Sequence, residues 1–338
     1  MPGAHRTLLA GALAGALLLL TGCTGDTPPP PLPSTPTVSA SGPPSIFLQK
    51  SVRIGTKNNQ PGTSTQNKEH VWSGFDVLVG RSVVRNLGRS SADAAFSDVI
   101  SGEREAKLTT DAEDLVVATY SITPERTEKV FFAGPYAKTS QGFMVRADET
   151  WLGSLDALRG RTVCSWGGTT SDTELRFQAT VKGYTVASAT DAQACLTELR
   201  EKRVDAVSTD QLILYGLARN DPGLKVVPEV KIGVPNFYGI GIKKERIEDC
   251  LRIRDYLKDY VLSSAWIQDF TAELPNAGPP DEYLPKPTDF DEQSCRELPH
   301  QSPVSPSPSA SPSASASASA SPSPSPSADP EPTAAATP

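Results

Sequence analysis

The sequence predicts an α/β protein in which mostly parallel strands are covered by helices on both faces. Three observations predict this class. Short apolar segments alternate with amphipathic ones between about residues 46 and 298. Residues that favour helix starts follow directly after several of the apolar segments. The core of roughly 250 residues is also long enough for two compact lobes. Such alternation is typical of parallel sheets with helices on both sides.

Apolar segments predict the strands in chain order, at 51–57, 114–120, 143–147, 161–166, 204–210 and 237–244. Amphipathic segments predict helices at 75–88 and 191–203, and the segment 248–270 predicts the final helices. Val79, Val83 and Leu87 share one face of the first of these helices, and Asp191 is the expected N-cap of the second.

Two further helix starts are predicted from capping residues. Thr123 supplies a hydroxyl cap, and Pro124 fits the first helical position because no N–H is needed there. Ser171 and Glu174 have the spacing of a capping box. Arg126 is unexpected in the first turn, since it places a cation at the positive end of the helix dipole. It is either a solvated surface arginine or a residue that holds an anion.

The two ends of the chain are not expected to belong to the folded core. Arg6 precedes an apolar run at 8–20 that suits a signal peptide and is too short to span a membrane. The run ends in Leu-Leu-Thr-Gly-Cys, which resembles a bacterial lipobox and predicts lipid attachment at Cys23; the alternative is an ordinary secretion signal with a chance cysteine. The expected segments are a signal peptide at 1–22, a Pro/Ser/Thr-rich tether at 23–45, a C-terminal extension at 276–300 and a disordered Ser/Pro/Ala tail at 301–338.

Charge and cysteine content narrow the class of protein. The formal net charge of −7 argues against nucleic acid as a partner and provides no basic stripe for a membrane surface. Five cysteines are an odd number for an exported chain. If Cys23 carries lipid, an even set remains for an oxidising compartment: Cys164, Cys195, Cys250 and Cys295.

Polar residues follow three of the predicted strands, where ligands bind in open parallel sheets. They are Ser121, Thr123 and Arg126 after the second strand, Gly167, Gly168, Thr169 and Thr170 after the fourth, and Thr209 and Asp210 at the end of the fifth. An α-amino acid needs such a set, because its carboxylate suits a planar guanidinium and free N–H groups while its ammonium suits an aspartate. Each feature also has a structural interpretation: a helix cap for Asp210, a simple turn for the Gly-Gly-Thr-Thr segment, and a satisfied loop hydroxyl for Ser121.

The same segments carry a family resemblance. Residues 118–136, 158–175 and 200–218 resemble the family 3 extracellular solute-binding proteins of ABC amino-acid importers, in particular the glutamate-binding lipoproteins of actinobacteria. The resemblance covers nearly all of 47–275. It implies a type II periplasmic-binding-protein-like fold, with two α/β lobes joined by two crossing strands that close over one amino acid. Lobe one would comprise 47–136 and 240–275, lobe two 142–235, and the hinge would lie near 136–141 and 236–239.

The resemblance also implies roles for individual residues. Ser121 and Arg126 would bind the α-carboxylate from lobe one, Thr169 and Thr170 would contact it from lobe two, and Asp210 would bind the ammonium. Three positions depart from the family pattern, namely Leu78, Phe131 and Asn59. For an acidic side chain of the ligand, the candidate partners are Lys57 and Arg104, each of which could instead be a surface cation.

The implied function is binding rather than catalysis. We expect no cofactor and no metal, and a monomeric protein at the outer face of the membrane that passes an amino acid to an ABC permease. A lipoprotein that signals amino acids to a membrane sensor is the alternative. A dehydratase-type enzyme on the same fold is disfavoured because only His70 and His300 remain after signal cleavage and neither lies in a strand-end motif.

The remaining cysteines predict two disulfides. Cys164 lies on the strand before the Gly-Gly-Thr-Thr segment, and Cys195 lies on the inward face of the helix before the Asp210 strand. Both should belong to lobe two, so we expect a Cys164–Cys195 bond and, by elimination, a Cys250–Cys295 bond. Two buried free thiols are the alternative to the first bond.

Overall fold

The computed structural model describes residues 43–299. The predicted signal peptide, Cys23, most of the tether, His300 and the Ser/Pro/Ala tail lie outside the described residues. A single eight-stranded sheet runs through the described unit in the order β5-β1-β6-β11-β7-β10-β8-β9. Its strands are β1 (Val52–Thr56), β5 (Ala94–Asp98), β6 (Leu115–Val116), β7 (Val130–Arg146), β8 (Thr162–Trp166), β9 (Thr185–Ala189), β10 (Ala206–Asp210) and β11 (Leu224–Lys243).

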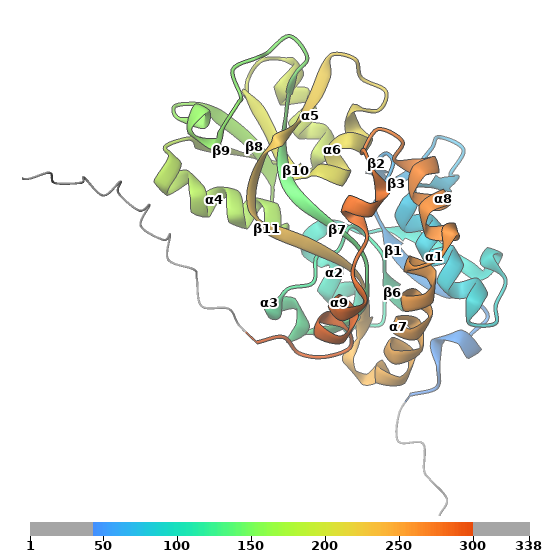
Figure 1. Ribbon diagram of the computed structural model, residues 1–338. Helices are drawn as coiled ribbons and strands as arrows, with labels where there is room; N and C mark the ends of the chain where they lie inside the picture. Colours follow the sequence, from blue (N-terminus) through green and yellow to red (C-terminus); the bar gives the residue numbers. More distant parts are fainter. Residues whose placement is uncertain (1–42, 300–338) are drawn as a thin grey trace, which may run out of the picture. The chain divides into compact units, whose positions relative to one another are not determined.

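Two long antiparallel strands divide this sheet into two lobes (Figure 1). β1 pairs in parallel with β5 and β6 in one lobe, and β8 pairs in parallel with β9 and β10 in the other. β7 and β11 pair with each other, β11 also reaches β6, and β7 also reaches β10. The predicted arrangement of mostly parallel lobes joined by two crossing strands is therefore confirmed. The division of the chain near residues 136, 142, 235 and 240 stays a prediction.

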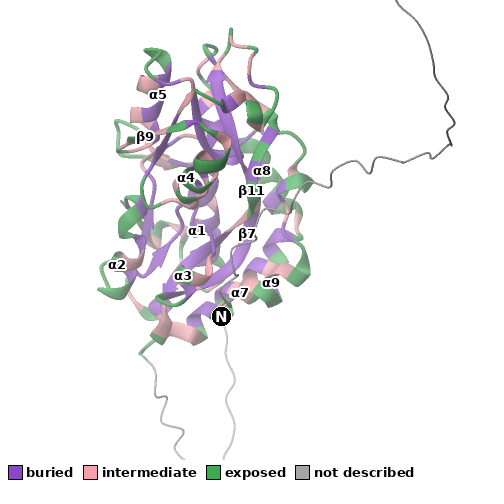
Figure 2. Ribbon diagram, turned by 90° about the vertical axis from the view of Figure 1, so that its left-hand side faces the viewer, coloured by how far each residue is buried: buried purple, intermediate pink, exposed green. Residues whose placement is uncertain are grey.

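Helices cover both faces of each lobe. They are α1 (Phe75–Asn86), α2 (Arg104–Thr109), α3 (Pro124–Thr127), α4 (Thr170–Lys182), α5 (Ala192–Arg200), α6 (Gln211–Ala218), α7 (Ile247–Val261), α8 (Ser264–Glu273) and α9 (Pro287–Gln293). Figure 2 shows buried strands between helices whose outer sides are exposed. Val79 and Val83 of α1 are fully buried and Leu87 packs beside them, as the periodicity predicts.

A small second sheet lies beside the first lobe. It consists of β2 (Asn59–Gln60), β3 (Ser64–Gln66) and β4 (Trp72–Ser73), paired antiparallel. Its strands are too short and too polar to be predicted from apolar periodicity.

Three local predictions differ from the structure. The helix after β8 begins at Thr170, and its N-cap is Thr169, whose Oγ1 accepts the N–H of Asp172 at 3.0 Å; the predicted cap at Ser171 is wrong because Ser171 already lies in the first turn. The predicted strand 114–120 forms ladder pairs only at Leu115 and Val116. The predicted strands 143–147 and 237–244 are parts of the two long crossing strands.

Both ends of the described unit are fixed to the first lobe. Ser45 Oγ donates to Asp249 of α7 at 2.5 Å, and the N–H of Ile46 donates to the same carboxylate at 3.0 Å. After α9, Ser294 bonds the backbone of Gly134, and the N–H of Leu298 donates to Thr127 Oγ1 at 3.0 Å. The C-terminal extension therefore binds along the first-lobe half of β7.

The structure contains both expected disulfides. Cys164 of β8 is bonded to Cys195 of α5, inside the hydrophobic core of the second lobe. Cys250 of α7 is bonded to Cys295, which follows α9. The second bond attaches the C-terminal extension to α7.

Candidate functional site

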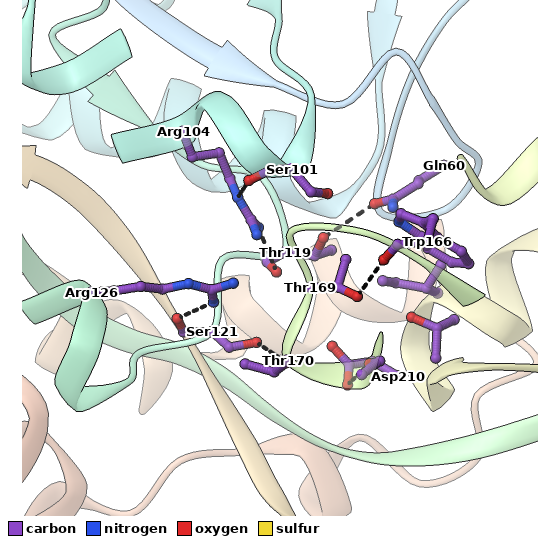
Figure 3. Close-up of a pocket in the computed structure, with 13 residues that line it drawn as sticks. Gln60, Ser101, Arg104, Thr119, Ser121, Arg126, Trp166, Thr169, Thr170 and Asp210 are labelled. Carbon is purple, nitrogen blue, oxygen red and sulfur yellow. Dashed lines mark hydrogen bonds between the residues drawn. The ribbon is translucent and has the colours of Figure 1, made fainter. Parts of the chain in front are cut away.

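Residues from both lobes enclose a small cavity where α4 and β10 meet the first lobe (Figure 3). Arg104 and Arg126 enter from one side and Asp210 lies opposite them (Figure 3). The cavity volume is about 10 Å³, which is about the room that one water molecule needs. Its lining residues are Gln60, Ser101, Arg104, Thr119, Ser121, Arg126, Trp166, Thr169, Thr170, Ser171, Thr209, Asp210 and Ile213.

Arg126 is not a solvated surface arginine. Its side chain is only 11 % exposed, and its guanidinium lies over the ring of Tyr120 at 5.1 Å. One Nη donates to the carbonyl of Ser121 at 2.7 Å, and the other donates to the carbonyl of Gly168 at 3.1 Å. Nε lies 3.4 Å from Glu105. The local reason for this placement is the single turn of α3, which Thr123 caps through the N–H of Arg126.

Arg104 opens α2 and is almost completely buried. Its guanidinium stacks on Tyr120 at 4.3 Å and donates to the carbonyls of Ser101, Ala118 and Gly168. Burial, with a second contribution from neighbouring Arg126, lowers the pKa of Arg104 to about 10. The side chain therefore still carries its charge at neutral pH and brings a second cation to the cavity.

The start of α4 meets both arginines from the second lobe. The Gly168 carbonyl accepts hydrogen bonds from Arg104 at 2.9 Å and from Arg126 at 3.1 Å. Gly168 has a φ of +75°, and a Cβ there would lie 2.5 Å from the backbone nitrogen of Gly102, so this position requires glycine. The hydroxyl of Thr170 lies 3.2 Å from that of Ser121, so the two lobes are in direct contact at this point.

Asp210 ends β10 on the other side of the cavity. Asn236 donates to Oδ1 and Tyr238 donates to Oδ2, each at 2.7 Å, and both donors lie on the crossing strand β11. Burial raises the pKa of Asp210, although these two donors, Arg126 and Ser171 act against the shift. Asp210 occupies the N-cap position of α6, but its side chain makes no capping hydrogen bond there.

A second buried carboxylate lies behind the cavity. Asp76 of α1 accepts from the hydroxyl of Tyr136 at 2.7 Å and from the N–H of Thr119 at 2.8 Å. Burial raises the pKa of Asp76 to about 7, against the effect of those two donors. Each crossing strand therefore supplies one tyrosine to one buried carboxylate, Tyr136 to Asp76 and Tyr238 to Asp210. The rings of these two tyrosines lie 6.1 Å apart.

Three predicted site residues do not line the cavity: Gly168, whose carbonyl the two arginines bond, Lys57 and Thr123. Lys57 is buried, and its Nζ donates to the carbonyl of Val99 at 2.7 Å. Burial, and then the charge of Arg104, lower the pKa of Lys57 to about 7. Thr123 caps α3 and lines a larger open groove beside the cavity.

Several lining residues are not predicted as binding residues from the sequence. Gln60 lies on β2, Ser101 precedes α2, and Trp166 ends β8. In the sequence, these residues are marked as site residues only by their closeness to predicted ones. Ser101 lies three residues before Arg104, and Gln60 lies three residues after Lys57. Which of them lines the cavity depends on how the two lobes meet.

Among residues 43–299, no helix is long and apolar enough to cross a membrane. The same residues contain no group of three or more histidine, cysteine or acidic side chains that could hold a metal ion.

Comparison with known proteins assigns the class. Residues 52–226, just over half of the chain, match the bacterial extracellular solute-binding proteins, family 3. The chain belongs to this family.

Individual relatives agree with that assignment. The glutamate-binding protein GluB of Corynebacterium efficiens is 34 % identical over 206 residues, which cover 58 % of this chain and 69 % of the relative. The glutamine-binding protein of Geobacillus stearothermophilus is 28 % identical over 177 residues, covering 52 % of this chain and 66 % of the relative. A crystal structure of the solute receptor for L-cysteine of Neisseria gonorrhoeae aligns with a TM-score of 0.65 at 20 % identity, over 71 % of this chain and 98 % of the receptor. At that identity the structural match supports the two-lobe fold alone.

Proposed function

We propose that this protein binds L-glutamate between its lobes and delivers it to an ABC importer. The observation that carries the proposal is the arrangement of charge across the cavity, with two arginines on one side and Asp210 on the other. Arg126, the Ser121 hydroxyl and the start of α4 suit an α-carboxylate, and Asp210 suits an ammonium.

Arg104 favours an acidic ligand side chain. The cavity holds a second guanidinium that the α-carboxylate does not require. A neutral glutamine side chain would leave this cation without an anionic partner. The 34 % identity to a protein named as glutamate-binding supports the same choice.

Binding requires the lobes to separate. A cavity of about 10 Å³ cannot admit an amino acid, because the Gly168 carbonyl and the Thr170 hydroxyl occupy the space in front of the arginines. We propose that β7 and β11 bend near residues 136–141 and 236–239, and that the ligand shifts the equilibrium between open and closed lobes. A lipid on Cys23 would hold the protein at the outer face of the membrane beside its permease.

Calorimetric titration of the twenty amino acids into the purified protein tests the function. We expect L-glutamate to bind more tightly than L-glutamine. Arg126→Ala should weaken glutamate binding by at least about a hundredfold, because two charge-assisted hydrogen bonds are lost.

Arg53→Ala is the matched control. Arg53 forms a two-bond ion pair with Asp114 on the first lobe, and neither residue lines the cavity. This variant should bind glutamate as the parent does. Glutamate affinity that is unchanged in Arg126→Ala would rule out the carboxylate assignment, and failure of all twenty amino acids to bind the parent protein would rule out the function.

A further inference from the structure

The tip of the small sheet contacts the second lobe outside the cavity. The side-chain amide of Asn59 on β2 donates to Asp191 Oδ2 at 3.1 Å. The side-chain amide of Gln193 on α5 donates back to the carbonyl of Asn59 at 3.1 Å. None of these three residues lines the cavity, and all three are half-buried.

Next to these hydrogen bonds, the backbone of the loop after β2 packs closely against α6. A Cβ on Gly216 of α6 would lie 1.9 Å from the carbonyl oxygen of Pro61, so the loop after β2 lies directly against the second lobe. Asp191 is held in place independently, because its Oδ1 caps α5 by accepting the N–H of Ala194 at 2.9 Å. The acceptor that faces Asn59 is therefore pre-oriented by its own helix.

We infer that Asn59, Asp191 and Gln193 form an interlobe clamp that sets ligand affinity without touching the ligand. These hydrogen bonds exist only when the lobes are together, so they contribute to closure and to nothing within either lobe. In the proposed ligand-bound state the lobes are also closed, so bonds that stabilise closure stabilise the complex relative to open, unliganded protein, and weakening the clamp lowers the apparent affinity. The link to affinity rests on the proposed function, whereas the link to closure does not.

The chain offers a charge exchange that tests this clamp. Asn59→Asp places a second carboxylate against Asp191, which repels it and removes the donated hydrogen bond. Adding Asp191→Asn reverses the pair, because the new amide can donate to residue 59 while its oxygen still caps α5. The double variant has the parent's net charge and hydrogen-bond count.

The first measurement needs no ligand. Spin labels on Val71→Cys and Val181→Cys, two exposed positions on opposite lobes, report the interlobe distance by pulsed electron resonance in a Cys23→Ser background. The four other cysteines are in disulfides. Asn59→Asp should shift the distance distribution toward longer values, and the double variant should restore the parent distribution.

The second measurement is glutamate affinity by calorimetry. Asn59→Asp should weaken binding by about tenfold, and the double variant should recover most of it. Asn67→Asp is the control, since Asn67 lies in the same small-sheet region and its side chain bonds only within the first lobe, to the N–H of Val71 at 2.8 Å.

The outcomes separate the clamp from the function. Unchanged distances in Asn59→Asp, or the same shift in Asn67→Asp, would overturn the clamp. Failure of the double variant to restore the parent distances would overturn it too. A distance shift that the double variant reverses, in a protein that binds no glutamate, would support the clamp and refute the proposed ligand.

Discussion

Asp210 combines burial with a charge that the proposed ligand needs. Taking a carboxylate out of water raises its pKa, and a protonated Asp210 could not pair with an ammonium. Tyr238 and Asn236 oppose this effect by donating to its two oxygens. Both donors lie on the crossing strand β11, which thus favours the ionised form of Asp210 and fixes its orientation.

Replacing Tyr238 should change how binding depends on pH. In Tyr238→Phe the ionised form of Asp210 loses a donor, so its pKa rises further above that of an ordinary aspartate. Binding needs the ionised form, so the loss of affinity on acidification should begin at a higher pH. We also expect about tenfold weaker binding at pH 7. Calorimetric titration of glutamate from pH 5 to 9 measures both effects.

Tyr260→Phe is the matched control for this prediction. It removes an equivalent hydrogen bond, from the Tyr260 hydroxyl to Asp269 at 2.8 Å, at a position that does not line the cavity. Asp76 also titrates, with a pKa of about 7, and its contribution is common to both variants. If the acid limb of Tyr238→Phe coincides with that of Tyr260→Phe, then Tyr238 does not position Asp210.

The site residues differ in how far the sequence could predict them. Arg126, Thr170 and Asp210 lie at or within a few residues of the C-terminal ends of predicted strands, and the ends of parallel strands meet in space, so strand positions predict them. Gln60 and Trp166 enter the cavity only because the lobes meet there. Lys57 shows the opposite case, since its side chain turns to the Val99 carbonyl, a contact that no sequence pattern indicates.

Among the elements, helix α5 and strand β8 form a covalently linked pair. The Cys164–Cys195 bond closes a loop of 31 residues. In the chain-entropy account, a loop of this size contributes about 3–4 kcal/mol to stability by restricting the unfolded chain. The bond joins the strand that leads into the α4 start to the helix that precedes the Asp210 strand.

Removing this disulfide should destabilise the second lobe. We expect the Cys164→Ala, Cys195→Ala double variant to unfold at a lower denaturant concentration and to bind glutamate more weakly. Removing Cys250 and Cys295 instead should lower stability with less effect on binding, because that bond lies in the first lobe outside the cavity lining. Denaturant unfolding followed by circular dichroism, with peptide mapping of the parent, provides the measurement. An equal loss of binding in both double variants would contradict this division.

Element boundaries show where sequence patterns are weak. The long strands β7 and β11 contain the predicted strands at 143–147 and 237–244, but polar residues such as Lys138 and Asn236 interrupt the apolar pattern. The crossing strands pass from one lobe to the other, and some of their residues are only partly buried. A continuous apolar pattern is therefore not expected along their whole length. At the start of α4, Thr169 and Ser171 both have a hydroxyl that could cap the helix, and only the backbone conformation decides between them.

At the scale of the whole molecule, the predicted lipid attachment at Cys23 lies outside the described residues and needs its own test. Radiolabelled lipid precursor should label the full-length protein, and Cys23→Ser should abolish the label and release the protein from the membrane fraction. Cys250→Ala provides a control for loss of a cysteine as such. Retention of Cys23→Ser protein in membranes would show that another segment holds it there.

The attachment of both described ends to the first lobe has a mechanical consequence. Ser45 and Leu298 each bond that lobe, and within residues 43–299 the backbone enters and leaves the second lobe through β7 and β11. In a protein tethered at its N-terminal side, the first lobe would keep a fixed position relative to the membrane. The second lobe, which carries Asp210, would then be the lobe that moves on opening and closing. A permease that contacts both lobes would therefore distinguish ligand-bound from ligand-free protein by the position of the second lobe relative to the first.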